Sequence, residues 1–403
     1  MARLRGRGAA TRTARVEAVR LARDIRAPLR HGHPWVWRDA LEGPVPAAGT
    51  IVDVLDAQGR FVARGFCDAG AIGVRILSRA PVSIDAAFFA RRLARAAALR
   101  DRMLPPETNA YRLVHGEGDG LPGVVVDVYG EVAVLRWDGA GAERLWDALQ
   151  SELVALLARR GVRSLLERRG ERGRPDVRIL MGERPEGELL VREHGMGLLV
   201  DVARGHKTGA FLDQRVSRAR VRSIAAGLRV LDLYGYTGGF AIAAGLGGAE
   251  RVTLVDRSGP ALETARRAWR ANGLPEGALE TVESDVETFL RENEGRRWDL
   301  VIADPPSFAP NEASVPRALA AYRRLHAACV ARLVRGGLHL ACSCSSHVRR
   351  EAFRRTLTEA AAQAGRSMLV VDEWGAPPDH PVPLAFPEGD YLKAILCVDG
   401  ATE

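Results

Sequence analysis

The 403-residue chain carries a formal net charge of +8, with 47% hydrophobic and 27% charged residues. This composition is typical of a water-soluble globular protein, and the length predicts two or three domains with buried cores. No stretch of sequence approaches the roughly 20 apolar residues that a membrane-spanning helix needs. The excess of arginine fits a polyanionic partner such as a nucleic acid, although a modest positive charge also serves solubility alone.

The first 20 residues are rich in arginine and lack an apolar core, which argues against a secretory signal. An organelle transit peptide is the alternative, but arginine is abundant along the whole chain and only Lys207 and Lys393 are lysines. Five cysteines without the spacing of a disulfide framework indicate a reducing compartment. We therefore expect a cytoplasmic protein without membrane association.

Residues 15–83 predict a small N-terminal domain of short strands. Residues 50–55 and 61–65 have the composition of strands, and a turn at 57–59 separates them. Short strands broken by turns are typical of a small β-barrel or sandwich.

A basic run in this N-terminal segment comes shortly before two tryptophans. Arginines attract phosphates, and an aromatic ring can stack on a base. We expect Arg30 and Trp35 to contact RNA; the alternative is that Trp35 and Trp37 both pack in the core. The run consists of Arg20, Arg23, Arg26 and Arg30.

Residues 84–193 predict a central α+β domain. Residues 84–102 have helical periodicity, and Ser83 is the expected N-cap of that helix. We expect strands at 111–115, 123–128 and 132–136, a tight glycine turn at 116–120, a second helix at 142–160, and a hairpin formed by 189–193 and 196–201.

The third predicted domain, residues 194–403, alternates strands with helices. Such alternation is typical of a doubly wound, mostly parallel sheet, so the fold class is α/β for this part. The expected strands are 230–233, 251–256, 298–303, 337–341, 368–372 and 391–397, and the expected helices are 238–246, 258–272, 316–333 and 349–364.

Acids stand at the ends of three consecutive strands of this sheet. Asp232 precedes a glycine-rich turn that opens a helix, where backbone N–H groups are free to bind a ligand. Asp256 comes where an acid can take the two hydroxyls of a ribose, and Asp285 where one can accept from an adenine amino group. The alternative is that each acid only caps a helix or sits in a solvated turn.

This trio suits S-adenosylmethionine, which is cationic and lacks a pyrophosphate, whereas a dinucleotide favours G-x-G-x-x-G at the first turn. We therefore expect S-adenosylmethionine as the cofactor. The expected cofactor contacts in the catalytic sheet are Asp232, Tyr234, Gly235, Tyr236, Thr237, Gly238, Asp256, Arg257, Ser258, Asp285, Val286, Asp304 and Pro305.

A rigid loop, Asp304-Pro-Pro-Ser-Phe308, follows the fourth strand of this sheet. Two prolines remove N–H donors and leave carbonyls to face a ligand. Asp304 stands where a planar base would enter, so we expect it to be catalytic. We expect Pro306 and Phe308 to contact the substrate. The alternative is a loop with a purely structural role.

Two cysteines follow the next strand, and its loop should lie beside the Asp304 loop. Cys344 should lie past the strand and be accessible, whereas Cys342 should still pack in the core, as most free cysteines do. Cys342, Cys344 and His347 offer three metal ligands without an evident fourth, so no metal is expected.

Seven motifs together resemble the bacterial ribosomal RNA large subunit methyltransferase I family, C5-cytosine enzymes with a PUA domain. The resemblance runs from about residue 26 to the C-terminal end of the sequence. The motifs are residues 30–37 (RHGHPWVW), 116–123 (GEGDGLPG), 205–215 (GHKTGAFLDQR), 236–240 (YTGGF), 304–308 (DPPSF), 343–345 (SCS) and 387–393 (PEGDYLK).

The resemblance implies a PUA-like barrel, a central α+β domain and a Rossmann-like class I methyltransferase domain. It also implies that Cys344 is the nucleophile, that the substrate is a cytosine of 23S ribosomal RNA, and that residues 209–215 belong to a cofactor lid. A homodimer is left open. The lid residues expected to contact the cofactor are Phe211, Asp213, Gln214 and Arg215.

Two features depart from what related enzymes lead us to expect. Other RNA C5-cytosine families carry a second cysteine after the proline in the loop that Asp304 opens, and Ser345-Ser346 stands where Ser-Gly is expected. Neither feature removes the nucleophile. An amino-group methyltransferase acting on N6 of adenine or N2 of guanine is an alternative, because a loop of the type Asp-Pro-Pro-aromatic can hold an exocyclic amine and this chemistry needs no thiol. A non-catalytic RNA-binding protein is a second alternative.

Overall fold

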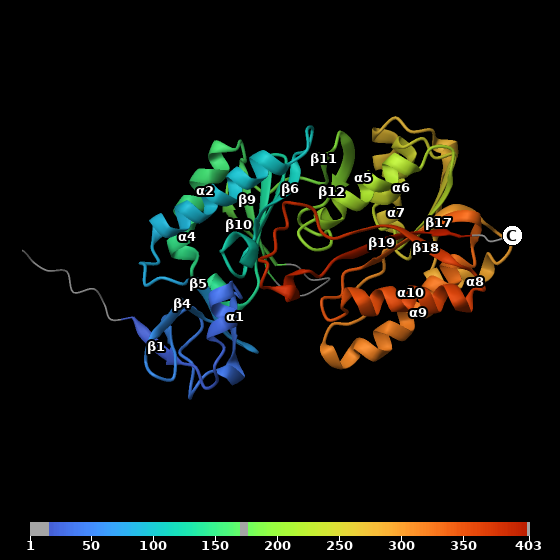
Figure 1. The fold of residues 1–403 in the computed structure, drawn as a ribbon. Coiled ribbons are helices and arrows are strands. Elements are labelled where there is room, and N and C mark those ends of the chain that lie inside the picture. The colour runs from blue at the N-terminus through green and yellow to red at the C-terminus, as the bar shows by residue number, and fades with distance from the viewer. Residues whose placement is uncertain (1–15, 170–175, 401–403) are drawn as a thin grey trace, which may run out of the picture.

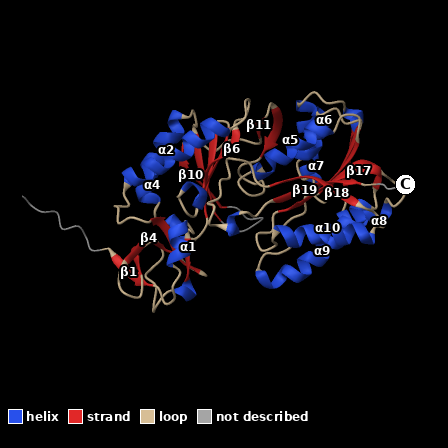
Figure 2. Ribbon diagram, viewed as in Figure 1, coloured by secondary structure: helices blue, strands red, loops and turns tan. Residues whose placement is uncertain are grey.

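The computed structural model describes residues 16–169 and 176–400, which form sheets of five, five, two and seven strands (Figure 1). The predicted domain start at Arg15, and most of the segment weighed as a transit peptide, lie outside the described residues. Figure 2 shows helices against the central and C-terminal sheets, with the N-terminal sheet at the lower left. Among the described helices, none combines the length and apolar character that crossing a membrane requires.

The N-terminal sheet contains the strands that the sequence predicts. Its order is β1-β3-β4-β5-β2, and it buries alternate residues such as Val52 and Val54 with 0% exposure. This alternation arises because successive side chains on a strand point to opposite faces. The elements are β1 (Glu17–Arg20), α1 (Arg26–His31), β2 (Trp35–Trp37), β3 (Ile51–Leu55), β4 (Phe61–Cys67) and β5 (Ile72–Ser78).

The central sheet has the order β10-β9-β8-β7-β6, and α2 and α4 pack together beside it. Its strands are β6 (Ala110–His115), β7 (Val124–Tyr129), β8 (Val132–Trp137), β9 (Ser164–Arg169) and β10 (Asp176–Met181), and its helices are α2 (Ala86–Met103), α3 (Ala140–Glu143) and α4 (Trp146–Arg159).

Three expectations for the central part are corrected. The cap of α2 is Asp85 rather than Ser83, because the Asp85 carboxylate accepts the N–H of Phe88 at 2.8 Å. The helix expected at 142–160 is divided into α3 and α4, and the glycine turn contains a short 3-10 helix, Gly116–Asp119. The strands β9 and β10 were not predicted.

The C-terminal sheet has the order β15-β14-β13-β16-β17-β19-β18, and β19 runs antiparallel to both of its neighbours. The remaining pairs are parallel, as expected for a doubly wound sheet. Its strands are β13 (Arg229–Leu233), β14 (Arg251–Asp256), β15 (Leu279–Glu283), β16 (Trp298–Ala303), β17 (Leu333–Ser343), β18 (Met368–Trp374) and β19 (Lys393–Asp399).

Helices flank this sheet and follow its parallel strands, which places the strand ends along one edge. No range was predicted for β15, although Asp285 was expected at the end of a strand. The helix expected at 316–333 ends at Val330, because Leu333 already belongs to β17. The helices are α5 (Arg215–Ile224), α6 (Gly239–Leu246), α7 (Gly259–Ala271), α8 (Val286–Glu292), α9 (Val315–Val330) and α10 (Arg350–Gln363).

A two-stranded hairpin, β11 (Leu189–Glu193) with β12 (Met196–Val200), stands between the two larger sheets in sequence. The predicted boundary between residues 193 and 194 falls in the turn of this hairpin, while β12 packs against α7. The division into domains at 15–83, 84–193 and 194–403 stays a prediction.

The segment between β18 and β19, residues 375–392, reaches back to the N-terminal half of the chain, as the red ribbon in Figure 1 shows. We call it the clasp. Asp379 accepts from the N–H of Arg112 at 2.9 Å and contacts Arg215 of α5, and Phe386 packs on Trp35 with ring centroids 4.5 Å apart. The clasp therefore contacts the N-terminal sheet, the central sheet and α5.

Candidate active site

The turn after β13 is shaped so that a ligand can approach its backbone. Tyr234 and Tyr236 have φ values of 61° and 49°, in the left-handed region that side chains rarely adopt. A Cβ at Gly235 would overlap Leu254 and lie 2.8 Å from Asp232 Oδ2. Gly238 has a φ of 78° and caps the N-terminus of α6. Backbone strain of this kind is concentrated at functional sites.

Asp232 is buried at the start of this turn with an incomplete set of partners. Its side chain is 0% exposed; Oδ2 accepts the N–H of Ala241 at 3.0 Å, whereas Oδ1 has no partner among the residues that the structure describes. Burial raises the pKa of Asp232 well above its usual value, and the charges of Asp304 and Asp256 raise it further. A cationic ligand group at Oδ1 would supply the missing partner.

Asp256 joins the ends of β13 and β14 rather than capping a helix. Its carboxylate accepts from the N–H groups of Tyr236 and Ser258, both at 2.9 Å. The cap of α7 is Ser258, whose hydroxyl accepts from Ala261 at 3.3 Å. The structure therefore places Asp256 against the glycine turn, and the predicted ribose contact stays a prediction.

Asp285 is exposed and caps α8, accepting from the N–H groups of Glu287 and Thr288 at 2.9 and 3.3 Å. The capping role weighed as an alternative is thus present. Its neighbour Val286 is buried. The predicted adenine contact stays a prediction.

Asp304 begins a loop at the end of β16, where Ala303 of this strand pairs with Ala341 of β17. The pKa of Asp304 is raised to about 7, chiefly by burial and also by the charge of Asp213, while the charge of Lys207 opposes the shift. Within the loop Pro305 is buried, Pro306 is exposed, and Phe308 packs on Tyr322 with ring centroids 4.8 Å apart.

The two cysteines lie as the sequence predicts. Cys342 is 0% exposed within β17, whereas Cys344 lies just past the strand and is half-buried. The pKa of the Cys344 thiol is raised to about 11, chiefly by burial and also by the charge of Asp304, while Lys207 and Lys393 oppose the shift. The nearby His347 is exposed.

Hydroxyl groups hold the Asp304 loop and the Cys344 loop together. Ser307 Oγ lies 3.0 Å from Ser345 Oγ. The buried hydroxyl of Tyr322, on α9, lies 2.9 Å from Ser343 Oγ and 3.0 Å from Ser345 Oγ. The prediction that these two loops lie side by side is confirmed, although the residues that join them were not predicted.

The predicted lid residues are largely buried and occupied by protein partners. Asp213 Oδ2 accepts from Lys207 Nζ at 2.5 Å and from the hydroxyl of Tyr391 at 2.8 Å. Phe211 packs against Tyr236 with ring centroids 5.8 Å apart, which brings this segment to the glycine turn.

The other two lid residues contact elements beyond that turn. The guanidinium of Arg215 bonds to Asp379 of the clasp, and Gln214 accepts from the hydroxyl of Ser217 at 2.6 Å. The cofactor contacts expected of Arg215 and Gln214 stay predictions.

The two predicted RNA contacts of the N-terminal sheet differ in their availability. Arg30 is exposed in the last turn of α1. Trp35 is half-buried, and its indole N–H donates to Glu117 at 2.8 Å while its ring packs on Phe386. Trp35 thus already bridges the N-terminal sheet, the central part and the clasp.

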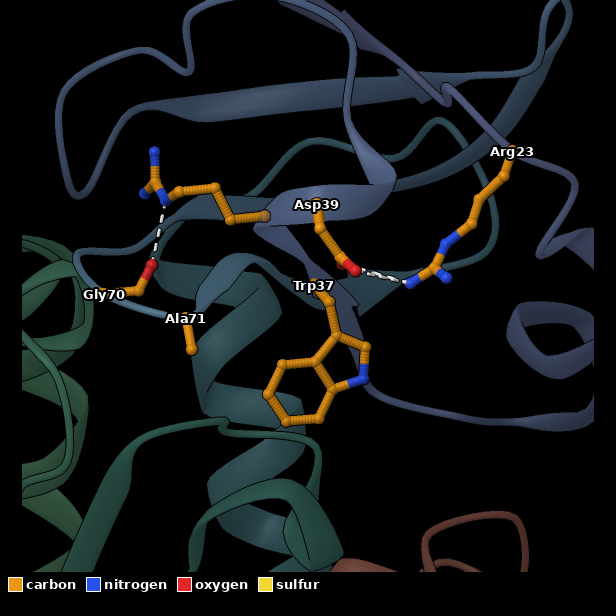
Figure 3. A pocket seen from close by; sticks show the side chains of 6 residues that line it. Arg23, Trp37, Asp39, Gly70 and Ala71 are labelled. Atoms are coloured by element: carbon orange, nitrogen blue, oxygen red, sulfur yellow. Dashed lines mark hydrogen bonds and ion pairs between the residues drawn. The ribbon is translucent and has the colours of Figure 1, made fainter. Parts of the chain in front are cut away.

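The neighbouring Trp37 was not predicted as a contact, yet its ring lines a surface hollow of about 630 Å³. Figure 3 shows its indole directed away from the ion pair of Arg23 with Asp39. The alternation of side chains along β2 could have indicated that Trp35 and Trp37 share a face. The hollow is lined by Arg23, Trp37, Arg38, Asp39, Gly70 and Ala71.

Among the described residues, His326, Cys329 and His339 form a buried group with metal-ligating atoms. His339 Nδ1 donates to the carbonyl of Val301 at 2.9 Å, so His339 Nε2 accepts from His326 Nδ1 at 3.0 Å. Burial lowers the pKa of His339 to about 4. The two rings are thus engaged with each other.

The comparisons with known proteins agree with this geometry. An S-adenosylmethionine-dependent methyltransferase family matches residues 146–397, and a PUA-like domain family matches residues 19–79. The chain is 38% identical over 388 residues to "Ribosomal RNA large subunit methyltransferase I" of Shigella boydii serotype 4, covering 94% of this chain and 98% of the relative. The protein of that name from Escherichia coli O139:H28 gives the same identity and coverage.

The chain belongs to the ribosomal RNA large subunit methyltransferase I family. The predicted resemblance is confirmed, and so is S-adenosylmethionine as the cofactor of the family. The cradle suits this molecule, because the buried Asp232 Oδ1 lacks a partner and a side chain at Gly235 would fill the turn.

Solved structures support the fold of this family member. A putative S-adenosylmethionine-dependent methyltransferase from Streptococcus mutans has a TM-score of 0.85 at 21% identity, covering 95% of this chain and 100% of that one. A putative methyltransferase complexed with SAH has a TM-score of 0.84 at 22% identity, covering 95% and 99%. The predicted fold class, with a PUA-like N-terminal domain and an α/β methyltransferase sheet, is confirmed.

Proposed function

We propose that the protein methylates C5 of a cytosine in large-subunit ribosomal RNA in the cytoplasm, through a transient bond between Cys344 and the base. The RNA class comes from the names of its relatives. The observation that carries the chemistry is the half-buried thiol of Cys344 at the end of β17, held beside the Asp304 loop by the contact of Ser307 with Ser345.

The glycine turn and its acids are our proposed cofactor cradle. Asp232 would hold the positively charged amino end of S-adenosylmethionine, because its free Oδ1 is buried and lacks a partner. Asp256 would bind the ribose hydroxyls and Asp285 the adenine amino group. When bound, S-adenosylmethionine supplies the electrophilic methyl group.

The protein residues must make C5 of cytosine nucleophilic. The Cys344 thiolate adds to C6, which forms an S–C6 bond and moves the electron pair of the C5=C6 bond toward C5. After C5 has received the methyl group, a base removes the C5 proton, the C5=C6 bond re-forms and the thiolate leaves. Asp304, whose pKa is raised to about 7, would donate to or accept from the ring during the addition. The base must leave any RNA stack to expose both faces.

RNA that carries 5-fluorocytosine tests this proposal. In this base fluorine replaces the hydrogen at C5, so there is no C5 proton to remove and the covalent adduct with the protein persists. We expect a crosslink with the parent protein and none with Cys344→Ala. A crosslink that persists in Cys344→Ala but disappears in Cys342→Ala would show that Cys342 is the nucleophile.

One observation favours the amino-group alternative. Burial raises the pKa of Cys344 to about 11, so the thiolate is scarce at neutral pH without a further positive charge. An amino-group methyltransferase would keep most of its rate in Cys344→Ser and give no crosslink. Mapping of the methylated base in RNA treated with the parent protein then decides between the two chemistries.

A further inference from the structure

The chain contains 58 lysines and arginines, of which only Lys207 and Lys393 are lysines. The fold brings both of them near Cys344, although they lie far apart in the sequence. Each lowers the pKa of the Cys344 thiol through its charge. Arginine serves as the long cation at every other position, and the site of Lys393 has a property that arginine does not match.

The buried position of Lys393 identifies that property. It is 1% exposed, and it pairs with Ser343 across the antiparallel strands β17 and β19. Its Nζ donates to the carbonyls of Ser345 at 2.6 Å and Tyr391 at 2.8 Å. The compact ammonium group of a lysine fits between two carbonyls. The planar guanidinium group of an arginine is longer, and it has more N–H donors that need hydrogen-bond acceptors.

Lys207 approaches the same site from the lid segment. Its Nζ lies 2.5 Å from Asp213 Oδ2 and 4.6 Å from the centre of the Phe211 ring. Its φ of 54° lies in the left-handed region, so the backbone is held in a conformation that side chains rarely adopt. Its side chain is 33% exposed, so it can be replaced with less disturbance than Lys393.

The groups around Cys344 leave the thiol in need of positive charge. Asp304 and Asp213 disfavour the thiolate, and burial does so more strongly. The two ammonium groups are the cations that oppose this effect. The titratable groups that interact with Cys344 are Lys207, Asp213, Asp304, Tyr322, Cys342, Tyr391 and Lys393.

We propose that Lys207 and Lys393 are positioning residues that act on the catalytic thiol as a pair, by stabilising the Cys344 thiolate from the lid side and from the β19 side. Lys393 also fixes the carbonyl of Ser345 and so the direction of the loop that carries the thiol. This inference rests on the proposed role of Cys344.

The test measures how fast iodoacetamide, an uncharged reagent, alkylates Cys344 between pH 6.5 and 9 in the full-length protein, followed by peptide mass mapping. A change of one pKa unit alters the thiolate fraction about tenfold below the pKa. Burial lowers the pKa of Lys393 to about 8, so its charge is present in the lower part of this range and is lost toward pH 9. We expect Lys207→Met and, below pH 8, Lys393→Met each to slow the reaction about tenfold, and Lys207→Arg, which keeps the charge, to stay within about threefold of the parent.

The other four cysteines serve as an internal control, because they are buried in the folded protein. If Lys393→Met unfolds, all five cysteines react, and Lys207→Met alone decides. Arg349→Met is a matched control that removes an exposed positive charge near the thiol in sequence. The inference is overturned if both lysine variants are folded and their Cys344 is alkylated at the parental rate. It is also overturned if Arg349→Met slows the alkylation of Cys344 as much as the lysine variants do.

The outcome is separable from the fate of the proposed function. A shifted alkylation profile together with normal methylation by Cys344→Ala would support the effect of the lysines on the thiol and refute covalent catalysis. An unshifted profile together with a crosslink that requires Cys344 would refute the lysine pair and leave the proposed function standing.

Discussion

Ser307 Oγ lies 3.0 Å from Ser345 Oγ, which joins the loop after β16 to the loop after β17. The first loop carries Asp304 and the second carries Cys344. The separation of these two groups is therefore set by a short hydroxyl bridge rather than by the strands alone. The hydroxyl of Tyr322 contacts the same bridge from α9.

Removal of the Tyr322 hydroxyl should weaken this bridge and the fold. In Tyr322→Phe, two serine hydroxyls lose a partner in a buried site, so we expect the free energy of unfolding to fall by about 1–3 kcal/mol. Urea denaturation measures this change. Tyr111→Phe is the control: its hydroxyl accepts only from the Nε of the half-buried Arg160 at 3.1 Å, so we expect a smaller loss. Equal losses in the two variants would contradict the prediction.

Asp304 should make stability fall as pH rises from about 4 to about 7. Its pKa is raised to about 7 in the folded protein, so over that range the unfolded chain releases a proton that the folded chain keeps. Asp304→Asn should therefore be more stable than the parent at pH 8, on the order of 1–4 kcal/mol, and equal to it near pH 4. Thermal melting across this pH range measures the difference.

Asp299 provides a control of opposite sign for that experiment. Its hydrogen bonds to Arg229 lower its pKa against the effect of burial, so Asp299→Asn should lose stability above pH 4, by up to about 1 kcal/mol for such a surface pair. If Asp304→Asn is destabilised at pH 8 in the same way, then the raised pKa of Asp304 is refuted.

Loss of the Asp256 carboxylate should weaken cofactor binding. We expect Asp256→Ala to bind S-adenosylmethionine less tightly by about 1.5–3 kcal/mol, because a charge-assisted hydrogen bond is removed. Calorimetric titration measures this affinity. Asp285→Ala is a useful comparison, because its exposed carboxylate also caps α8. Parental affinity in a folded Asp256→Ala protein would show that the ribose is bound elsewhere.

Arg30 should contribute to the salt dependence of RNA binding. It is exposed, and one lost phosphate contact should reduce the slope of log K against log salt by about 0.7–0.9 in Arg30→Ala. Arg23→Ala is the control, because Arg23 pairs with Asp39 at 3.0 Å and its charge is already balanced. A deletion of the residues before Ile84 should flatten the slope further. Unchanged slopes in the folded deletion protein would exclude this part from RNA binding.

Features encoded locally could be predicted from the sequence. The end of β13 at Leu233, the acids at 232 and 256 and the place of Cys344 just past β17 all follow from strands, turns and helices that are adjacent in the chain. The range of β15 could not be predicted because this strand lies at the sheet edge and is only half-buried, so its apolar pattern is weak.

Features that depend on distant segments could not be predicted. Tyr322, Lys393 and Lys207 meet near Cys344 only because three separate elements pack there, and none of them carries a local motif for that role. The composition held one unused signal, since the two lysines are so rare in this chain. The partner of Trp35 was equally hidden, because Glu117 belongs to the central part.

The clasp has a consequence for the order in which the protein matures during synthesis. A ribosome completes the N-terminal and central sheets well before it reaches residues 375–392, and domains generally fold as they emerge. Asp379, Phe386 and Lys393 therefore arrive last, at partners that have already folded. A nascent chain that stops before residue 375 can hold its early sheets, but it lacks both Tyr391 beside Asp213 and the lysine that fixes the loop of Cys344. The loop that carries Cys344 can thus take its final position only after Lys393 has been synthesised.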